Sequence, residues 1–161
     1  MKNIKFSPER MTREYQQTIH TTPEKIFPLL CPVREADWLD GWQYNMLYSK
    51  SGLVEEGAVF STPCEGEEDT VWVVTKHDPK TYLIEFVRFT HRSRTCVLKI
   101  AVKSKDGNSS YVDVSYTYTG ITPEGNDFLN HFTEDAFLGA VIFWEKSMNY
   151  FLETGERLTK A

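Results

Sequence analysis

Apolar and polar residues alternate along most of the middle of the chain, which is the pattern of half-buried β-strands. The alternation predicts strands over residues 11–20, 44–50, 58–63, 70–77, 81–90, 95–103 and 110–119. One face of the last segment carries two valines and two tyrosines: Val112, Val114, Tyr116 and Tyr118. Turn residues separate the last six segments, and connections this short join antiparallel neighbours, because a parallel crossover needs about a dozen residues.

Two other stretches predict helices. Thr22 and Pro23 form a typical helix start, and Pro28 and Pro32 keep this helix short before a second short one over Val33–Trp38. From about residue 126 the apolar spacing becomes three and four, which predicts one long helix of roughly 42 Å over Asn126–Glu153. Its apolar face has two rows, one of Phe137, Val141, Trp144, Met148 and Leu152, the other of Leu129, Phe132, Ala136, Ala140 and Phe143.

This order of elements predicts an α+β fold in which a seven-stranded antiparallel sheet must curl around the long helix. A flat sheet of that width would leave most of one face uncovered by a single helix. Curling leaves an interior that side chains need not fill, so the topology predicts a pocket. At 161 residues the chain has the length of one domain, which we take as 1–161 with a core at about 11–154, and residues 155–161 as a polar tail.

Composition and charge argue against several classes of partner and location. The net charge of −5 argues against a nucleic-acid partner, which needs a basic face. No stretch approaches the ~18 apolar residues of a membrane helix, so we expect no integral membrane association. Three distant cysteines, Cys31, Cys64 and Cys96, form no disulfide or zinc spacing. With no signal-peptide pattern at the start, we expect a cytoplasmic protein.

The chain resembles the helix-grip superfamily (SRPBCC), which includes START domains, birch-pollen-allergen-like proteins, polyketide cyclases and chaperone-activator-like proteins. The resemblance covers roughly residues 13–155 and is carried by Thr22–Phe27, Trp38, Trp42, the Asp78–Pro79 turn and the long C-terminal helix. The segment Cys31–Trp42 resembles an uncharacterised prokaryotic branch. The resemblance implies a curved seven-stranded sheet around that helix, two short helices between strands 1 and 2, and a deep, mostly apolar cavity for a small hydrophobic molecule. It does not imply one reaction.

Three acidic residues, Glu35, Asp37 and Asp40, cluster around Trp38 and Trp42. One interpretation is a carboxyl group at the cavity mouth whose pKa is raised by aromatic neighbours, so that it acts as an acid or base. The other is an exposed helix end with solvated carboxylates and core tryptophans. The second is the more common arrangement.

Metal and nucleophile chemistry have weaker support. Asp127, His131 and Asp135 are spaced four apart, as helical metal ligands are, but acids near a helix start also complement the helix dipole. No cysteine has a histidine at a suitable spacing, and the acidic run 65–69 lacks a calcium-loop pattern. We therefore expect no metal and no cofactor, and no catalytic residue can be assigned.

Aromatic residues give the most informative pattern. If the strand phases hold, several rings point inward, and Arg88 follows them in phase at a position where it can meet a ligand carboxylate. The predicted ligand-binding residues are Trp38, Trp72, Phe86, Arg88, Cys96, Leu98, Tyr116, Tyr118, Phe137, Val141 and Trp144. The alternative is that these rings pack together and leave no cavity.

Three functions fit these observations. The first is binding of a small hydrophobic ligand, such as a lipid, a polyketide or a similar molecule, in a cavity between the sheet and the C-terminal helix. The second is a cyclase, dehydratase or hydrolase acting on such a ligand, for which a buried acid or base with a shifted pKa would be the sign. The third is a chaperone-activator-like interaction module, with a filled cavity and an exposed apolar patch. Each is compatible with a homodimer.

Overall fold

A computed structural model describes residues 5–160, so the ends of the predicted 1–161 domain, residues 1–4 and 161, lie outside the described residues. Its seven strands are β1 (Arg10–Ile19), β2 (Asn45–Tyr48), β3 (Val59–Thr62), β4 (Thr70–Asp78), β5 (Leu83–Thr90), β6 (Arg94–Ser104) and β7 (Ser110–Gly120). They form one antiparallel sheet in the order β1-β7-β6-β5-β4-β3-β2. The predicted α+β fold with a seven-stranded antiparallel sheet is therefore confirmed.

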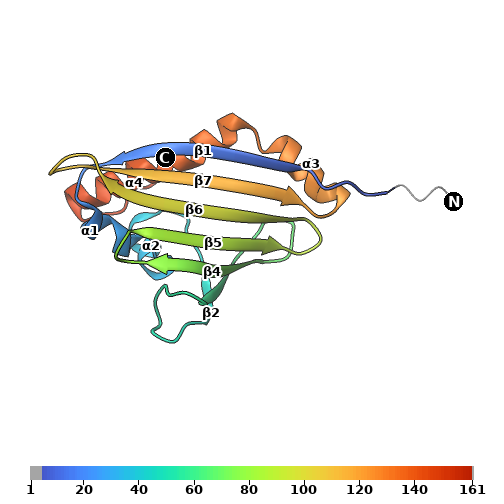
Figure 1. Ribbon diagram of the computed structural model, residues 1–161, viewed down its shortest axis with the longest axis horizontal. Helices are drawn as coiled ribbons and strands as arrows, with labels where there is room; N and C mark the ends of the chain where they lie inside the picture. Colours follow the sequence, from blue (N-terminus) through green and yellow to red (C-terminus); the bar gives the residue numbers. More distant parts are fainter. Residues whose placement is uncertain (1–4, 161) are drawn as a thin grey trace.

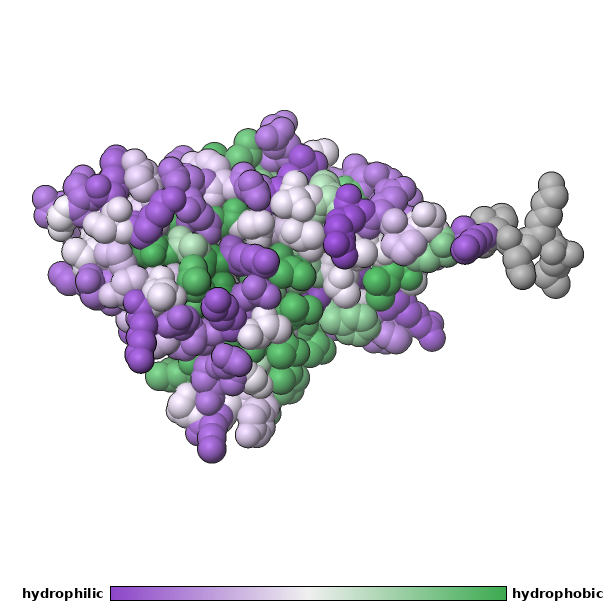
Figure 2. Space-filling model, in the orientation of Figure 1, coloured by the Kyte–Doolittle hydropathy of each residue, from purple (hydrophilic) through white to green (hydrophobic). Residues whose placement is uncertain are grey.

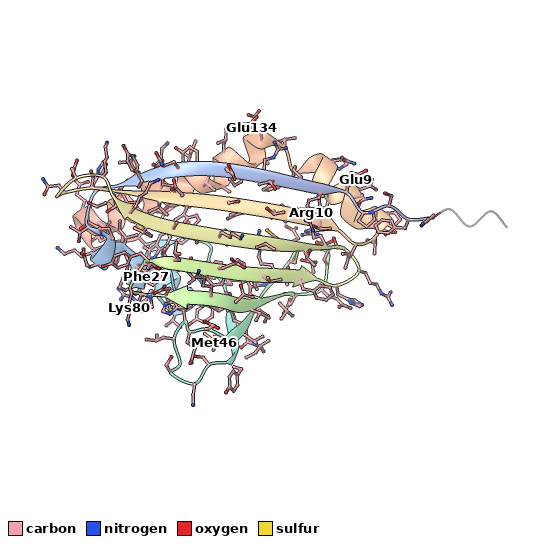
Figure 3. The ribbon with its side chains drawn as sticks, viewed as in Figure 1. Glu9, Arg10, Phe27, Met46, Lys80 and Glu134 are labelled. Carbon is pink, nitrogen blue, oxygen red and sulfur yellow. The ribbon has the colours of Figure 1, made fainter. Side chains whose placement is uncertain are left out.

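The helices lie together on one side of this sheet (Figure 1). Between β1 and β2 the chain forms α1 (Pro23–Ile26), a 3-10 turn η1 (Phe27–Leu29) and α2 (Pro32–Trp38). Each of these short elements has a proline at its first or second position, which explains why the segment breaks into short pieces. After β7 follow α3 (Pro123–His131) and α4 (Glu134–Thr154). In Figure 3, Met46 marks the β2 edge of the sheet and Glu134 the start of α4.

The prediction of one continuous helix over Asn126–Glu153 was wrong, because the helix is interrupted. Phe132 has a non-helical backbone (φ −82°, ψ 78°), and the Thr133 hydroxyl accepts a hydrogen bond of 3.2 Å from the Ala136 amide. This threonine cap starts a new helix, and Glu134 and Asp135 complement its dipole. Apolar spacing continues across the break, so periodicity alone does not show it. The break also divides the proposed row of Asp127, His131 and Asp135 between two helices.

The core lies between the sheet and α4. On α4 the buried row contains Phe137, Val141, Trp144 and Met148, as predicted, whereas Ala136 and Ala140 of the second row are exposed. Strand alternation is also confirmed, since Val112 and Val114 of β7 are buried. Inward residues of the sheet and this helix row form one apolar cluster. A buried hydrogen bond of 3.0 Å from the Gln17 amide to the Val141 carbonyl joins β1 to α4.

The outer face of the sheet, away from α4, is largely polar with an apolar area over its middle strands (Figure 2). Val59, Val73, Val87 and Val97 are paired in register across β3, β4, β5 and β6. Of these, Val73 is 37% exposed, and nearby Phe89 is 40% exposed. No helix among the described residues is long and apolar enough to cross a membrane.

The predicted polar tail over residues 155–161 makes contacts with the rest of the fold in its described part, residues 155–160. Gly155 ends the helix in a left-handed conformation (φ 74°), as glycine does readily. The chain then turns back toward the segment that follows α2. Leu158 forms a parallel bridge with Leu39, and the Lys160 amide donates a 3.0 Å hydrogen bond to the Asp40 carboxylate. The C-terminal segment thus packs beside the end of α2.

Candidate functional site

A cavity of about 800 Å³ lies between the inner face of the sheet and α4. This volume is in the usual range for small-molecule sites. Its lining comes from α2 and the following loop, the inner faces of β3 to β7, α4 and the C-terminal segment. The lining residues are Glu35, Leu39, Asp40, Gly41, Trp42, Phe60, Trp72, Phe86, Arg88, Leu98, Ile100, Tyr116, Gly139, Ala140, Phe143, Trp144, Leu158, Thr159 and Lys160.

The strand side of the cavity is an aromatic wall. Strand alternation turns Phe60 of β3, Trp72 of β4 and Phe86 of β5 to the same face. The rings of Phe60 and Trp72 stack at 5.1 Å, and Phe86 meets Trp72 edge-on at 5.6 Å. Trp42, from the loop after α2, meets Trp72 edge-on at 6.0 Å. These rings present large apolar surfaces held in fixed orientations.

The helix side of the cavity is open because α4 has small residues there. Gly139 and Ala140 are exposed and line the cavity, one turn before the larger Phe143 and Trp144, which also line it. A Cβ atom added to Gly139 would meet no heavy atom within 4 Å. Glycine inside a helix lowers its stability by roughly 0.5–1 kcal/mol relative to alanine. The helix is therefore less stable at this position, which borders the open space.

Arg88 places a cation in the aromatic wall. Its guanidinium carbon lies 4.7 Å from the ring centre of Trp72, 5.0 Å from that of Tyr116 and 5.5 Å from that of Tyr118. One terminal nitrogen donates to the Tyr118 hydroxyl at 2.7 Å and to the Cys96 sulfur at 3.4 Å. These contacts fix the guanidinium plane among three ring faces.

Arg88 also borders a second, smaller cavity of about 180 Å³. That cavity is lined by polar and sulfur-containing side chains, including Cys64, Arg94, Cys96 and Tyr118. Burial raises the pKa of the Tyr118 phenol, although the charge of Arg88 opposes the shift. Tyr118 therefore remains a neutral phenol at physiological pH. Arg88 stands at the boundary of an apolar and a polar space.

Glu35 brings a carboxyl group to the large cavity. It belongs to α2, is partly buried, and forms no side-chain hydrogen bond within residues 5–160. Burial raises its pKa to about 8, because the surrounding protein solvates the charged form poorly. The Tyr116 phenol has a pKa raised mainly by burial, opposed by the charge of Arg88 and increased slightly by that of Glu35. Glu35, Arg88 and Tyr116 therefore share one space.

The three acidic residues grouped in the sequence have separate environments. Asp37 is exposed and pairs with Arg34 at 3.1 Å, and Asp40 accepts from the Lys160 amide at the rim. Glu35 fits the interpretation of a carboxyl group with a raised pKa. Asp37 fits the solvated alternative.

The structure brings together six of the predicted ligand-binding residues in the large cavity: Trp72, Phe86, Arg88, Leu98, Tyr116 and Trp144. Cys96 and Tyr118 line the small cavity instead. Trp38, Phe137 and Val141 line neither cavity and are fully buried in the core. Trp38 is held there by its indole N–H, which donates to the Leu29 carbonyl at 3.1 Å, and by stacking on Trp144 at 6.3 Å.

Other lining residues were missed or left unassigned by sequence reasoning. Trp42 was noted as a family feature and as a neighbour of the acidic cluster, and Phe143 only as part of an apolar row. Gly139 carried a usable signal, since a glycine inside a predicted helix needs a packing or functional reason. Leu158 and Lys160 carried none, because a short segment after a helix shows nothing of its tertiary contacts.

Other features of the described residues carry less chemistry. A hollow of about 610 Å³ lies on the outer face of the sheet, bordered by charged side chains of both signs that include Glu14, Lys76, Glu85, Lys99 and Asp113. Its open, charged lining contrasts with the aromatic wall of the inner cavity. In the part of the chain that the structure describes, no three His, Cys, Asp or Glu side chains are grouped to hold a metal ion.

Comparison with solved structures gives matches over nearly the whole chain. Norcoclaurine synthase from Thalictrum flavum, solved with dopamine and hydroxybenzaldehyde, is 15% identical, with a TM-score of 0.68 over 96% of this chain and 91% of that one. The Zhui aromatase/cyclase from a Streptomyces species is 10% identical, with a TM-score of 0.65 over 93% and 100%. Ara h 8.0201 is 16% identical, with a TM-score of 0.61 over 91% and 100%.

No protein-family model and no curated protein matches the sequence. At these identities the structural matches establish the fold and leave the ligand and any reaction open. The shared features are the seven-stranded antiparallel sheet, the short helices between β1 and β2, and the long C-terminal helix. The chain therefore has the same fold as these solved structures, a seven-stranded antiparallel sheet packed on a long C-terminal helix.

Proposed function

We propose that the protein binds a small, mainly apolar molecule in the cavity between the sheet and α4. The observation that carries this proposal is the open space of about 800 Å³ with an aromatic wall on one side and small residues on the other. Apolar ligand area removed from water contributes about 25 cal/mol per Å², less the cost of ordering the ligand. The ligand class we propose is that of lipids, polyketides and similar compounds.

The open cavity favours binding over the interaction-module hypothesis. That hypothesis required a filled cavity, whereas Gly139 and Ala140 leave open space beside the rings. The apolar area on the outer face, around Val73 and Phe89, remains compatible with contacts to another protein or a second copy. We propose a cytoplasmic protein with no nucleic-acid partner, since its net charge is −5.

Glu35 supports a second candidate function, an enzyme of the cyclase or dehydratase type. A carboxyl group with a pKa of about 8 is well matched to accept or donate a proton at neutral pH. It lines the same cavity as Arg88, which can stabilise an oxyanion that develops in a substrate. Glu35→Gln should then abolish turnover of a bound substrate and leave its affinity within about threefold. An unchanged rate would exclude Glu35 as the proton-transfer group.

The binding proposal is tested with Nile red, a neutral dye whose emission rises in apolar surroundings. We expect one saturable site with micromolar affinity. Ala140→Trp should fill the cavity and weaken binding at least tenfold, because Ala140 lines it. Ala136→Trp is the matched control: Ala136 is also exposed on α4, one turn earlier, and does not line the cavity.

Both variants should keep the circular dichroism spectrum of the parent protein. The proposal is wrong if Nile red shows no saturable binding. It is also wrong if the two tryptophan variants bind the dye equally well, because binding would then take place outside this cavity.

A further inference from the structure

Arg88 lacks a carboxylate partner although it lies inside the protein. No ion pair among the described residues includes it, and its hydrogen bonds go to Tyr118 and Cys96 from a single nitrogen. Within residues 5–160 the other two guanidinium nitrogens have no hydrogen-bond acceptor, and neither is among the fully buried polar atoms that lack a partner. They are therefore open to the adjoining cavities, which Arg88 lines.

Arg94, on the neighbouring strand, shows how a buried arginine is normally satisfied in this protein. Its terminal nitrogen contacts both carboxylate oxygens of Glu67, at 3.0 and 3.1 Å, and its guanidinium lies over the Phe128 ring at 3.4 Å. Arg88 has the aromatic contacts and lacks the carboxylate. A buried cation is costly unless it is paired, so the absence of a counterion at Arg88 needs an explanation.

We propose that the missing counterion is the ligand, and that Arg88 recognises the carboxylate of a flat aromatic acid. This inference rests on the proposed binding function and names its ligand class. A carboxylate matches the two-donor edge of a guanidinium, which forms paired, charge-assisted hydrogen bonds. The aromatic wall of Phe60, Trp72 and Phe86 lines the same cavity as Arg88, so a flat apolar body bound beside Arg88 would lie against aromatic side chains.

The other charged residues that line the large cavity leave this position available to an anion. Asp40 and Lys160 lie at the rim, where the Asp40 carboxylate is engaged by the Lys160 amide. Glu35 makes no ion pair with Arg88. Burial keeps Glu35 mostly protonated at neutral pH, so it does not repel an acid there. Arg88 is thus the cation available to the carboxylate of an acid that binds inside the cavity.

The test compares 2-naphthoate with its neutral methyl ester, each displacing Nile red at pH 7. A purely apolar cavity favours the ester, since ionised groups lose more solvation on binding. We expect the parent protein to bind 2-naphthoate at least tenfold more tightly than the ester. Arg88→Met should remove this preference by weakening naphthoate alone, with ester affinity within threefold of the parent. Arg88→Lys keeps the positive charge but loses the two-donor edge of the guanidinium, so it should retain part of the preference for the acid.

Lys146→Met is the charge control: Lys146 is exposed on α4 and lines neither cavity, so this variant should change neither affinity by more than threefold. If the parent protein binds the ester as tightly as the acid, the inference is wrong while the binding function stands; this comparison needs no variant. The inference is also wrong if Lys160→Met, which removes the other cation of the cavity lining, weakens naphthoate binding as much as Arg88→Met does. If dye, acid and ester all fail to bind, the binding function itself is wrong.

Discussion

Glu35 makes the stability of this protein depend on pH in a direction that is uncommon for a glutamate. Its carboxyl lines the cavity and pairs with no cation of residues 5–160, and burial raises its pKa from the usual 4.5 to about 8. Below pH 4.5 the group is neutral in both the folded and the unfolded chain. Between pH 4.5 and 8 the unfolded chain ionises while the folded protein stays protonated. The free energy of unfolding therefore falls as pH rises through this window.

Glu35→Gln removes this dependence, because glutamine has nearly the same shape and no charge. Each pH unit between the two pKa values costs roughly 1.4 kcal/mol, so the full effect has an upper limit of about 5 kcal/mol. Glu35 borders an open cavity, where water screens its charge, so we expect about 2–3 kcal/mol. The variant should match the parent protein at pH 4 and be more stable by this amount at pH 9.

Urea unfolding followed by tryptophan fluorescence at pH 4, 6, 7.5 and 9 measures the difference. Other titrating groups cancel, because both proteins contain them. A difference between variant and parent that stays constant from pH 4 to 9 would show that Glu35 titrates normally, and the assignment of a poorly solvated carboxyl would be refuted. Asp37→Asn is the matched control. Asp37 is exposed on the same helix, and its variant should show a difference below about 0.5 kcal/mol.

Three further predictions concern α4. Trp144→Ala should destabilise the fold by about 3–5 kcal/mol, because Trp144 is 8% exposed and stacks on Trp38; a melting temperature within a degree or two of the parent would contradict this. Gly139→Ala should stabilise it by roughly 0.5–1 kcal/mol, seen as a rise of a few degrees in melting temperature, because the added Cβ meets no atom. Thr133→Ala should cost about 1 kcal/mol in urea unfolding through loss of the helix cap, whereas a continuous helix would show no such loss.

Local patterns in the sequence were sufficient for the strands and for the phase of their side chains. Successive side chains of a strand point to opposite faces of the sheet, so residues two positions apart share a face. Phe86 and Arg88 of β5 were therefore correctly placed on one face. Prolines act on the backbone through their own geometry, so the short helices before β2 also followed from the sequence. The order of elements, and the resemblance with it, predicted a cavity between the sheet and the long helix, and the structure contains one.

The break between α3 and α4 depends on local capping hydrogen bonds, which the apolar periodicity of the sequence does not show. Apolar residues continue through Phe132, but the Thr133 hydroxyl satisfies an amide of a new helix, and the backbone breaks there. The apolar pattern of α4 also does not show how the helix is rotated about its own axis relative to the sheet. Val141 faces the core directly, whereas Ala140, one residue away, lines the cavity.

The sequence by itself determined the antiparallel pairing of consecutive strands from β2 to β7, the side-chain phases and the aromatic character of the inner wall, because these depend on residues close together in the chain. Folding paired β1 with β7, whose partners, such as Arg10 and Thr119, lie far apart in the chain. Tertiary structure alone decided which inward residues meet open space. It also placed the C-terminal segment beside Asp40, left Arg88 without a carboxylate and raised the pKa of Glu35 to about 8. Solvation and charge pairing arise from neighbours brought together by folding, and their effect cannot be assigned before those neighbours are known.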